Sequence, residues 1–127
     1  MRQLTFFTTT FFLILLFIAC STPIEGVEVL SCKEFDKKLQ ETKQEQIIDV
    51  RTLDEFNGGT IQTAMNIDFY SKNFKKNINA FDKNRPVFVF CAKGGRSSSA
   101  CKIFKEEGFK VIYDLEGGYT AWSQYKK

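Results

Sequence analysis

A chain of 127 residues is long enough for one domain with a continuous hydrophobic core and too short for two. Its 43% hydrophobic and 26% charged residues are typical of a globular protein, and a net charge of +3 without a basic stripe and interleaved aromatic residues does not predict nucleic-acid binding. The chain has no histidine, which excludes Ser-His-Asp and Cys-His catalysis and most zinc sites, so its chemistry must use cysteine, carboxylate, lysine, arginine or backbone groups.

Residues 1–19 have the pattern of an export signal and not of a folded element. Arg2 precedes an apolar run at 11–19. That run is shorter than the roughly 20 apolar residues that a transmembrane helix needs. We therefore interpret residues 1–19 as a signal peptide.

The end of this run resembles the bacterial lipobox, in which a cysteine after a small residue is lipidated and becomes the mature N-terminus. Ala19 and Cys20 match that pattern, whereas Phe17 stands where the pattern usually has Leu. We expect Cys20 to be lipidated, with residues 20–26 as a linker, and the protein to be exported to the bacterial periplasm or cell envelope. Its only link to the membrane is then the lipid. There are two alternatives: an ordinary cleaved signal peptide with an incidental cysteine, and an uncleaved membrane anchor.

The rest of the chain alternates strand and helix patterns. Residues 27–30 predict a short strand. Ser31 and Glu34 then form a capping box, which opens a helix with Phe35 and Leu39 on one face.

The next segment repeats this order. Residues 47–50 predict a buried strand, and Thr52 with Glu55 forms a second capping box. A third short strand is predicted at 64–67.

A helix is predicted from Ser71, with Phe74, Ile78 and Phe81 at helical spacing. The neighbouring Lys75 is interpreted as part of a solvated helix face.

Residues 86–90 give the clearest strand pattern, apolar throughout as in a central parallel strand. A helix follows from about 97 to 107 and is expected to end at Gly108. The last strand is predicted at 111–113, before a closing helix that Trp122 anchors in the core.

Strands separated by helices predict an α/β fold, with a small parallel β-sheet flanked by helices on both faces. We expect a single domain over residues 27–127.

The loop after the central strand carries the candidate chemistry. Its residues are Cys91, Ala92, Lys93, Gly94, Gly95, Arg96 and Ser97. Adjacent glycines before a helix let successive N–H groups point inward, and such a nest attracts negative charge. A cysteine at its floor is expected to have a lowered pKa and to react as the thiolate, with Lys93 and Arg96 adding charge at the rim.

Residues 91–97 resemble the active-site loop of the rhodanese family. Three further segments, at 48–51, 55–67 and 115–122, resemble the other signatures of that family in the same order. Two positions depart from the pattern: Thr60 stands where the family usually has His, and Thr63 where it usually has Gly. Both belong to a structural turn.

The resemblance implies a rhodanese-like fold and a sulfurtransferase in which Cys91 carries sulfane sulfur. It implies that residues 92–97 bind the substrate, that Asp49 and Arg51 support the site, and that no metal or organic cofactor takes part. The donor is then a small sulfur-containing anion such as thiosulfate, and the acceptor is cyanide or a thiol, including a protein thiol. Four residues between Cys91 and Arg96 favour sulfur transfer, because the related phosphatases carry one more.

A non-catalytic or sulfur-relay module that serves a protein partner is the alternative function. Cys32 and Cys101 are interpreted as buried thiols, although a disulfide between them, or Cys101 as a resolving partner of Cys91, are possible.

Overall fold

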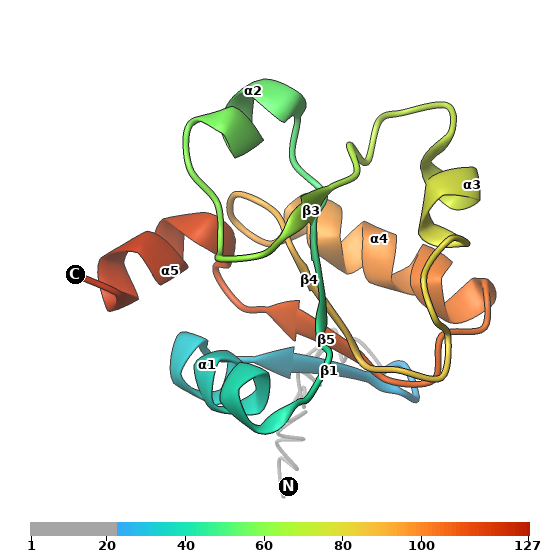
Figure 1. Cartoon of the computed structure of the whole chain (residues 1–127), viewed down its shortest axis with the longest axis horizontal. Helices are drawn as coiled ribbons and strands as arrows, with labels where there is room; N and C mark the ends of the chain where they lie inside the picture. Colours follow the sequence, from blue (N-terminus) through green and yellow to red (C-terminus); the bar gives the residue numbers. More distant parts are fainter. Residues whose placement is uncertain (1–22) are drawn as a thin grey trace, which may run out of the picture.

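The computed structural model describes residues 23–127, so the predicted signal peptide 1–19 and Cys20 lie outside the described residues. Five strands alternate with five helices along that part of the chain (Figure 1). The strands are β1 (Val27–Leu30), β2 (Gln46–Asp49), β3 (Met65–Asn66), β4 (Val87–Phe90) and β5 (Ile112–Leu115). The helices are α1 (Cys32–Glu41), α2 (Leu53–Asn57), α3 (Phe74–Ile78), α4 (Gly95–Glu106) and α5 (Gly118–Tyr125).

The strands form one parallel sheet in the order β1-β5-β4-β2-β3. The strand β4 therefore lies at the centre, between β5 and β2, and all four of its residues are buried. A parallel strand covered on both faces is expected to be apolar throughout, as this one is. The predicted α/β class with a small parallel sheet is confirmed.

One face of the sheet packs against α3 and α4. Because successive strand residues point to opposite sides, Val87 and Val89 share this face. They belong to one buried cluster with Phe74 of α3 and Phe104 of α4.

The opposite face packs against α1 and α5. Phe88 and Phe90 of the central strand join Phe35 of α1 and Trp122 of α5 in the second buried cluster. The ring of Phe35 lies edge-on to Phe88, at 5.2 Å between centroids, and to Trp122, at 5.9 Å. Trp122 is thus a core anchor, as predicted.

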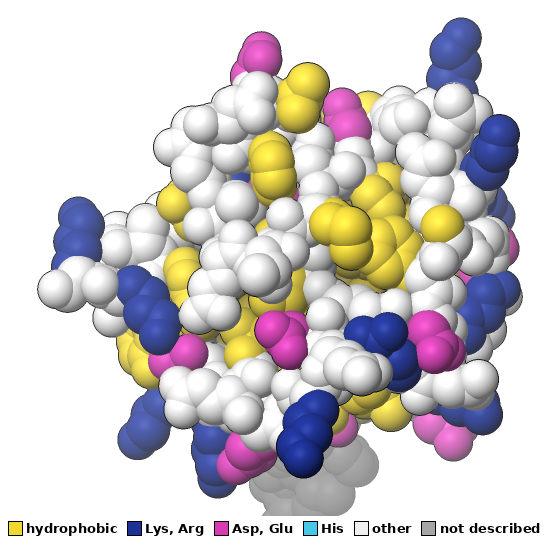
Figure 2. Space-filling view, viewed as in Figure 1, with side chains coloured by type: hydrophobic (Ala, Val, Ile, Leu, Met, Phe, Trp, Pro, Cys, Tyr) yellow, Lys and Arg dark blue, Asp and Glu magenta, His cyan; other side chains and the backbone are white. Residues whose placement is uncertain are grey.

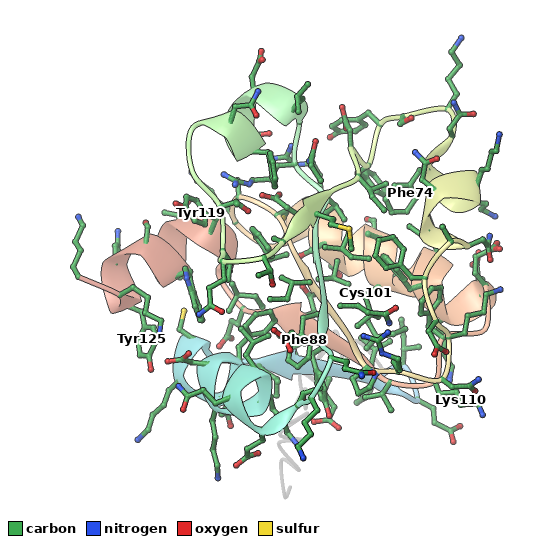
Figure 3. All side chains as sticks on the ribbon, viewed as in Figure 1. Phe74, Phe88, Cys101, Lys110, Tyr119 and Tyr125 are labelled. Carbon is green, nitrogen blue, oxygen red and sulfur yellow. The ribbon has the colours of Figure 1, made fainter. Side chains whose placement is uncertain are left out.

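The two faces separate the remaining cysteines. Cys101 belongs to the cluster under α4, whereas Cys32 packs against the cluster under α1. Figure 3 shows the same division, with Cys101 near α4 and Phe88 near α1. Both thiols are free and the sheet lies between them, which excludes the alternative of a Cys32–Cys101 disulfide. Cys101 is buried as predicted, whereas Cys32 is only half-buried.

Both predicted capping boxes are present, at Ser31 and at Thr52, and Gly108 after α4 has a φ of +94°. Some boundaries differ from the prediction. The helix α3 covers only five residues, because the Asn79 side chain donates a hydrogen bond of 2.7 Å to the carbonyl of Lys75 and helps to end it.

The helix α4 begins at Gly95, two residues before the predicted start. Gly94 has a φ of +112°, and this left-handed turn takes the chain directly from the loop into the helix. The first helical N–H groups therefore lie within the candidate loop itself.

Lys and Arg side chains lie mostly around the rim of the face seen in Figure 2, and apolar side chains lie nearer its middle. On this face the basic residues do not form one continuous stripe. Within residues 23–127, no helix combines the length and apolar character needed to cross a membrane.

The start of α5 is seated directly on the end of β4. The N–H of Tyr119 donates to the carbonyl of Cys91 at 2.8 Å, and the N–H of Thr120 donates to the carbonyl of Ala92 at 3.0 Å. Gly118 makes this approach possible: its φ is +60°, and a Cβ there would lie 2.5 Å from the carbonyl oxygen of Cys91. Only glycine fits without a backbone shift.

We predict that Gly118→Ala destabilises the domain by about 2–4 kcal/mol, because alanine combines left-handed strain with a clash against backbone. Urea unfolding measures the change. Gly58→Ala is the matched control, since its φ is −74° and its Cβ would make only an ordinary contact, 3.4 Å from the Glu55 carbonyl oxygen. Equal stability of the two variants would contradict the prediction.

Candidate active site

The cup that the sequence predicted is formed at the carboxyl end of β4. The chain leaves the sheet at Phe90, and Cys91 lies at the base of the turn with 1% of its surface exposed. The N–H of Gly94 donates to the Cys91 Sγ at 3.0 Å. The sulfur therefore lies where backbone donors converge at the start of α4, a position that favours an anion.

Ser97 closes the cup from the first turn of α4. Its side chain is fully buried, and its Oγ lies 3.6 Å from the Cys91 Sγ. The hydroxyl also donates to the carbonyl of Gly94 at 3.2 Å. This serine thus contacts the sulfur and helps to hold the turn.

The surroundings of Cys91 favour its thiolate. Burial alone would raise the pKa of the Cys91 thiol. Hydrogen bonds from the N–H and hydroxyl of Ser97, and from the N–H groups of Gly94 and Lys93, outweigh burial and lower that pKa below its ordinary value. The lowering comes from backbone and hydroxyl donors, without any imidazole.

Arg96 holds the loop to a second element. Its guanidinium makes a two-pronged ion pair with Glu55 of α2, with both N–O distances at 2.8 Å. The same carboxylate accepts from the N–H and the hydroxyl of Thr52, each at 3.0 Å. Hydrogen bonds from Arg96 lower the pKa of Glu55 to about 2. The charge of Arg96 is therefore largely matched by Glu55, and its main contribution is to brace the loop.

Glu55 is a site residue that the sequence interpretation missed. The capping box with Thr52 already explains a glutamate at position 55. The sequence therefore gives no sign that this residue also pairs with Arg96. Only the fold brings α2 against the start of α4.

Asp49 and Arg51 lie behind the cup, not in it. Both are buried, and the Arg51 Nη2 is 2.6 Å from an Asp49 carboxylate oxygen. The same nitrogen donates to the carbonyl of Gly59 at 2.6 Å, and the guanidinium lies 4.3 Å from the ring centre of Tyr119. Thr60, in the position where the family usually has His, donates to Asp49 at 2.9 Å. This network ties β2 and the following turn to α5.

The other loop residues differ in exposure. Ala92 is half-buried, whereas Lys93 and Gly95 are exposed at the mouth of the cup. The amino group of Lys93 can therefore meet an anion that approaches from solvent. Among residues 23–127, no three His, Cys, Asp or Glu side chains lie together as a metal site would require.

The sequence of this chain is similar to those of known proteins. The family described as "Rhodanese-like domain" matches residues 31–125. The thiosulfate sulfurtransferase GlpE of Shewanella oneidensis is 36% identical over 87 residues, which cover 68% of this chain and 84% of the relative. A sulfurtransferase of Allochromatium vinosum is 25% identical over 99 residues, 78% of this chain and 91% of its own.

A solved structure agrees with these sequence matches. The crystal structure of a rhodanese-like domain protein from Staphylococcus aureus superimposes with a TM-score of 0.66 at 34% identity. The match covers 75% of this chain and 90% of the other.

We predict that Glu55→Gln costs about 1 kcal/mol of stability near neutral pH, because both partners are partly exposed and solvent screens the pair. Glutamine still supports a capping box, so the loss isolates the ion pair. Since the pKa of Glu55 is lowered by folding, its contribution is complete above the ordinary value of 4.5 and is lost as the pH falls towards about 2.

Urea unfolding at several pH values measures this difference. Glu41→Gln is the control, because Glu41 pairs with Lys37 at 3.7 Å on an exposed helix face. A stability difference for Glu55→Gln that does not shrink with acid would show that the ion pair is not its source.

Proposed function

The chain belongs to the rhodanese-like domain family, and on that premise we propose that it is a sulfurtransferase that moves sulfane sulfur through a persulfide on Cys91. One observation carries the proposal: the buried Cys91 sulfur accepts a hydrogen bond from the N–H of Gly94 at 3.0 Å, in a cup that lowers its pKa. A thiolate held by backbone donors is a nucleophile ready for an anionic substrate.

Thiosulfate is the proposed donor. The Cys91 thiolate attacks its sulfane sulfur, a new S–S bond forms, and sulfite leaves with the electrons of the bond that breaks. The N–H groups of the loop then face the negative charge of the persulfide. The relative in Shewanella oneidensis, whose name gives thiosulfate as its substrate, supports this choice.

A nucleophilic acceptor completes the cycle. Cyanide or a thiol attacks the outer sulfur of the persulfide, and Cys91 leaves as the thiolate. The acceptor departs as thiocyanate or as a new persulfide, so no cofactor is consumed and the two half-reactions predict ping-pong kinetics.

The loop length supports sulfur as the cargo. Four residues separate Cys91 from Arg96, and Glu55 binds the guanidinium of Arg96 from outside the cup. With Arg96 held there, the charge available at the mouth is that of Lys93, which suits a small anion.

We predict that Cys91→Ser lowers the rate of thiocyanate formation from thiosulfate and cyanide by at least about a thousandfold, because the hydroxyl is not a comparable nucleophile at neutral pH. Cys32→Ser is the matched control, since Cys32 lies on the other face of the sheet and should leave the rate unchanged. Retained turnover in the Cys91 variant, with its fold intact by circular dichroism, would refute the mechanism.

We also propose that the protein acts outside the cytoplasm, held to a membrane by a lipid on Cys20. The apolar run that ends at Ala19 supports this, as does the short distance from Cys20 to the start of the domain. The lipid alone then sets the location, because the proposed anchor does not span the membrane.

Metabolic labelling with a fatty acid tests the anchor. We predict that the full chain takes up label when expressed in a bacterium, and that Cys20→Ala abolishes the label while Cys32→Ala keeps it. An unlabelled wild-type chain would rule out the lipid.

A further inference from the structure

The face of the sheet beneath α4 is only partly covered. Parallel neighbours in register point to the same side, so Val89 of β4, Asp114 of β5 and Val29 of β1 form one row across this face. Val89 is fully buried and Asp114 is 4% exposed, whereas Val29, on the edge strand, is 63% exposed. The cover over this row therefore ends between β5 and β1.

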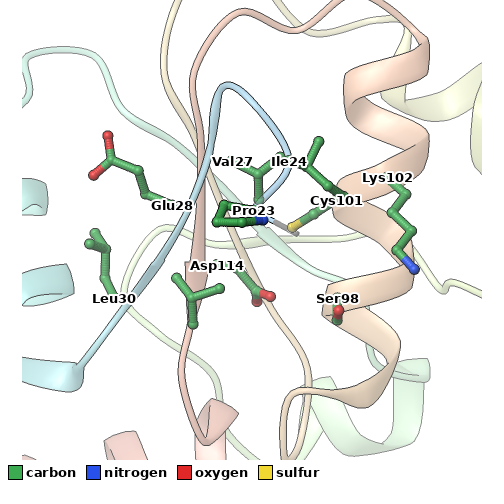
Figure 4. A pocket seen from close by; sticks show the side chains of 10 residues that line it. Pro23, Ile24, Val27, Glu28, Leu30, Ser98, Cys101, Lys102 and Asp114 are labelled. Carbon is green, nitrogen blue, oxygen red and sulfur yellow. The ribbon is translucent and has the colours of Figure 1, made fainter. Parts of the chain in front are cut away.

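A pocket of about 780 Å³ opens where that cover ends, between β1 and α4 (Figure 4). This volume is typical of small-molecule sites, which measure about 300–1,000 Å³. The apolar lining comes from β1 and from the two residues that lead towards it: Pro23, Ile24, Val27, Val29 and Leu30. The pocket can therefore hold the apolar part of a small molecule.

The carboxyl of Asp114 is the buried charged group of this pocket. Within residues 23–127, its Oδ1 accepts no hydrogen bond, and no Lys or Arg forms an ion pair with it. Burial raises the pKa of Asp114 to about 6, so the carboxyl is ionised at neutral pH. A buried acceptor without a donor costs free energy, and a ligand that supplies the donor recovers that cost.

The other charged side chains of the pocket do not neutralise Asp114. In Figure 4 the amino group of Lys102 and the carboxyl of Glu28 both point away from the Asp114 carboxyl. The other polar groups are the hydroxyl of Ser98 and the thiol of Cys101, which burial keeps protonated by raising its pKa. A hydroxyl can accept a hydrogen bond from the same ligand that Asp114 binds. The pocket thus offers one negative charge and a hydroxyl acceptor beside an apolar wall.

We propose that this pocket binds a small organic cation, an ammonium group on an aliphatic or aromatic body. The ammonium group donates hydrogen bonds to the carboxylate of Asp114, and the apolar body lies against Val27 and Val29. An anionic ligand of the same size is disfavoured, because its charge would meet that of Asp114. Of the residues that line the pocket, none belongs to the cup at 91–97, so the proposal does not depend on sulfur transfer.

Titration of the full chain with hexylammonium chloride tests the proposal, with the chemical shifts of the backbone amides as the readout. We expect a dissociation constant in the millimolar range, as is usual for so small a ligand, and the largest shifts at residues 27–30, 98–102 and 114. Sodium hexanoate is the matched control ligand, because it has a carbon chain of similar length and the opposite charge. It should bind at least about tenfold more weakly.

Three results of this titration would overturn the proposal. They are equal affinity for the two compounds, shifts centred away from the pocket, and the absence of saturable binding. The last of these includes the case in which residues before Pro23 already fill the pocket in the full chain.

Asp114→Asn removes the charge and nearly preserves the shape of the side chain. It should weaken hexylammonium binding about tenfold, whereas Glu28→Gln, at a carboxyl that points away, should change it less than about twofold. Thermal unfolding shows whether each variant is folded. Equal weakening by the two substitutions would mean that the ligand senses only the overall charge of this surface, and Asp114 would then not be its partner.

The pH dependence of the wild type decides the matter if Asp114→Asn does not fold. Hexylammonium stays charged over the range used, and Asp114 binds it as the carboxylate. The affinity should therefore fall about fivefold from about pH 7.5 to about pH 5, as Asp114 takes up its proton. Glu28→Gln should show the same dependence. An affinity that is constant over this range would contradict the proposal.

Discussion

The hydrogen bond from the N–H of Gly94 to the Cys91 sulfur is the interaction on which the account of this domain depends. In a chain without histidine, a cysteine becomes a nucleophile only if other groups stabilise its negative charge. Backbone N–H groups at the start of α4 do this here, with the hydroxyl of Ser97. The fold fixes the positions of these donors, so they need no rearrangement when the negative charge develops during the reaction.

The rest of the structure holds that cup from several sides. The start of α5 approaches so closely at Gly118 that a methyl group would not fit against the backbone of Cys91. The ion pair of Arg96 with Glu55 ties the other end of the loop to α2. Each contact joins segments far apart in the sequence, so the geometry at Cys91 depends on the whole parallel sheet being formed.

The sequence was sufficient to predict the parallel α/β fold, both capping boxes and the loop, because these follow from local periodicity and from residues close together in the chain. It did not predict the partner of Arg96, since Glu55 is 41 residues away and already had a local explanation. The alternative of a Cys32–Cys101 disulfide could not be decided from the sequence either, because spacing does not show which face of the sheet a cysteine occupies.

The central claim is that Cys91 carries sulfane sulfur, and mass analysis of the protein after incubation with thiosulfate tests it most directly. The account predicts that the peptide containing Cys91 gains the mass of one sulfur atom, and that cyanide removes it. No gain at that peptide, or an equal gain at the peptides containing Cys32 or Cys101, would contradict the account.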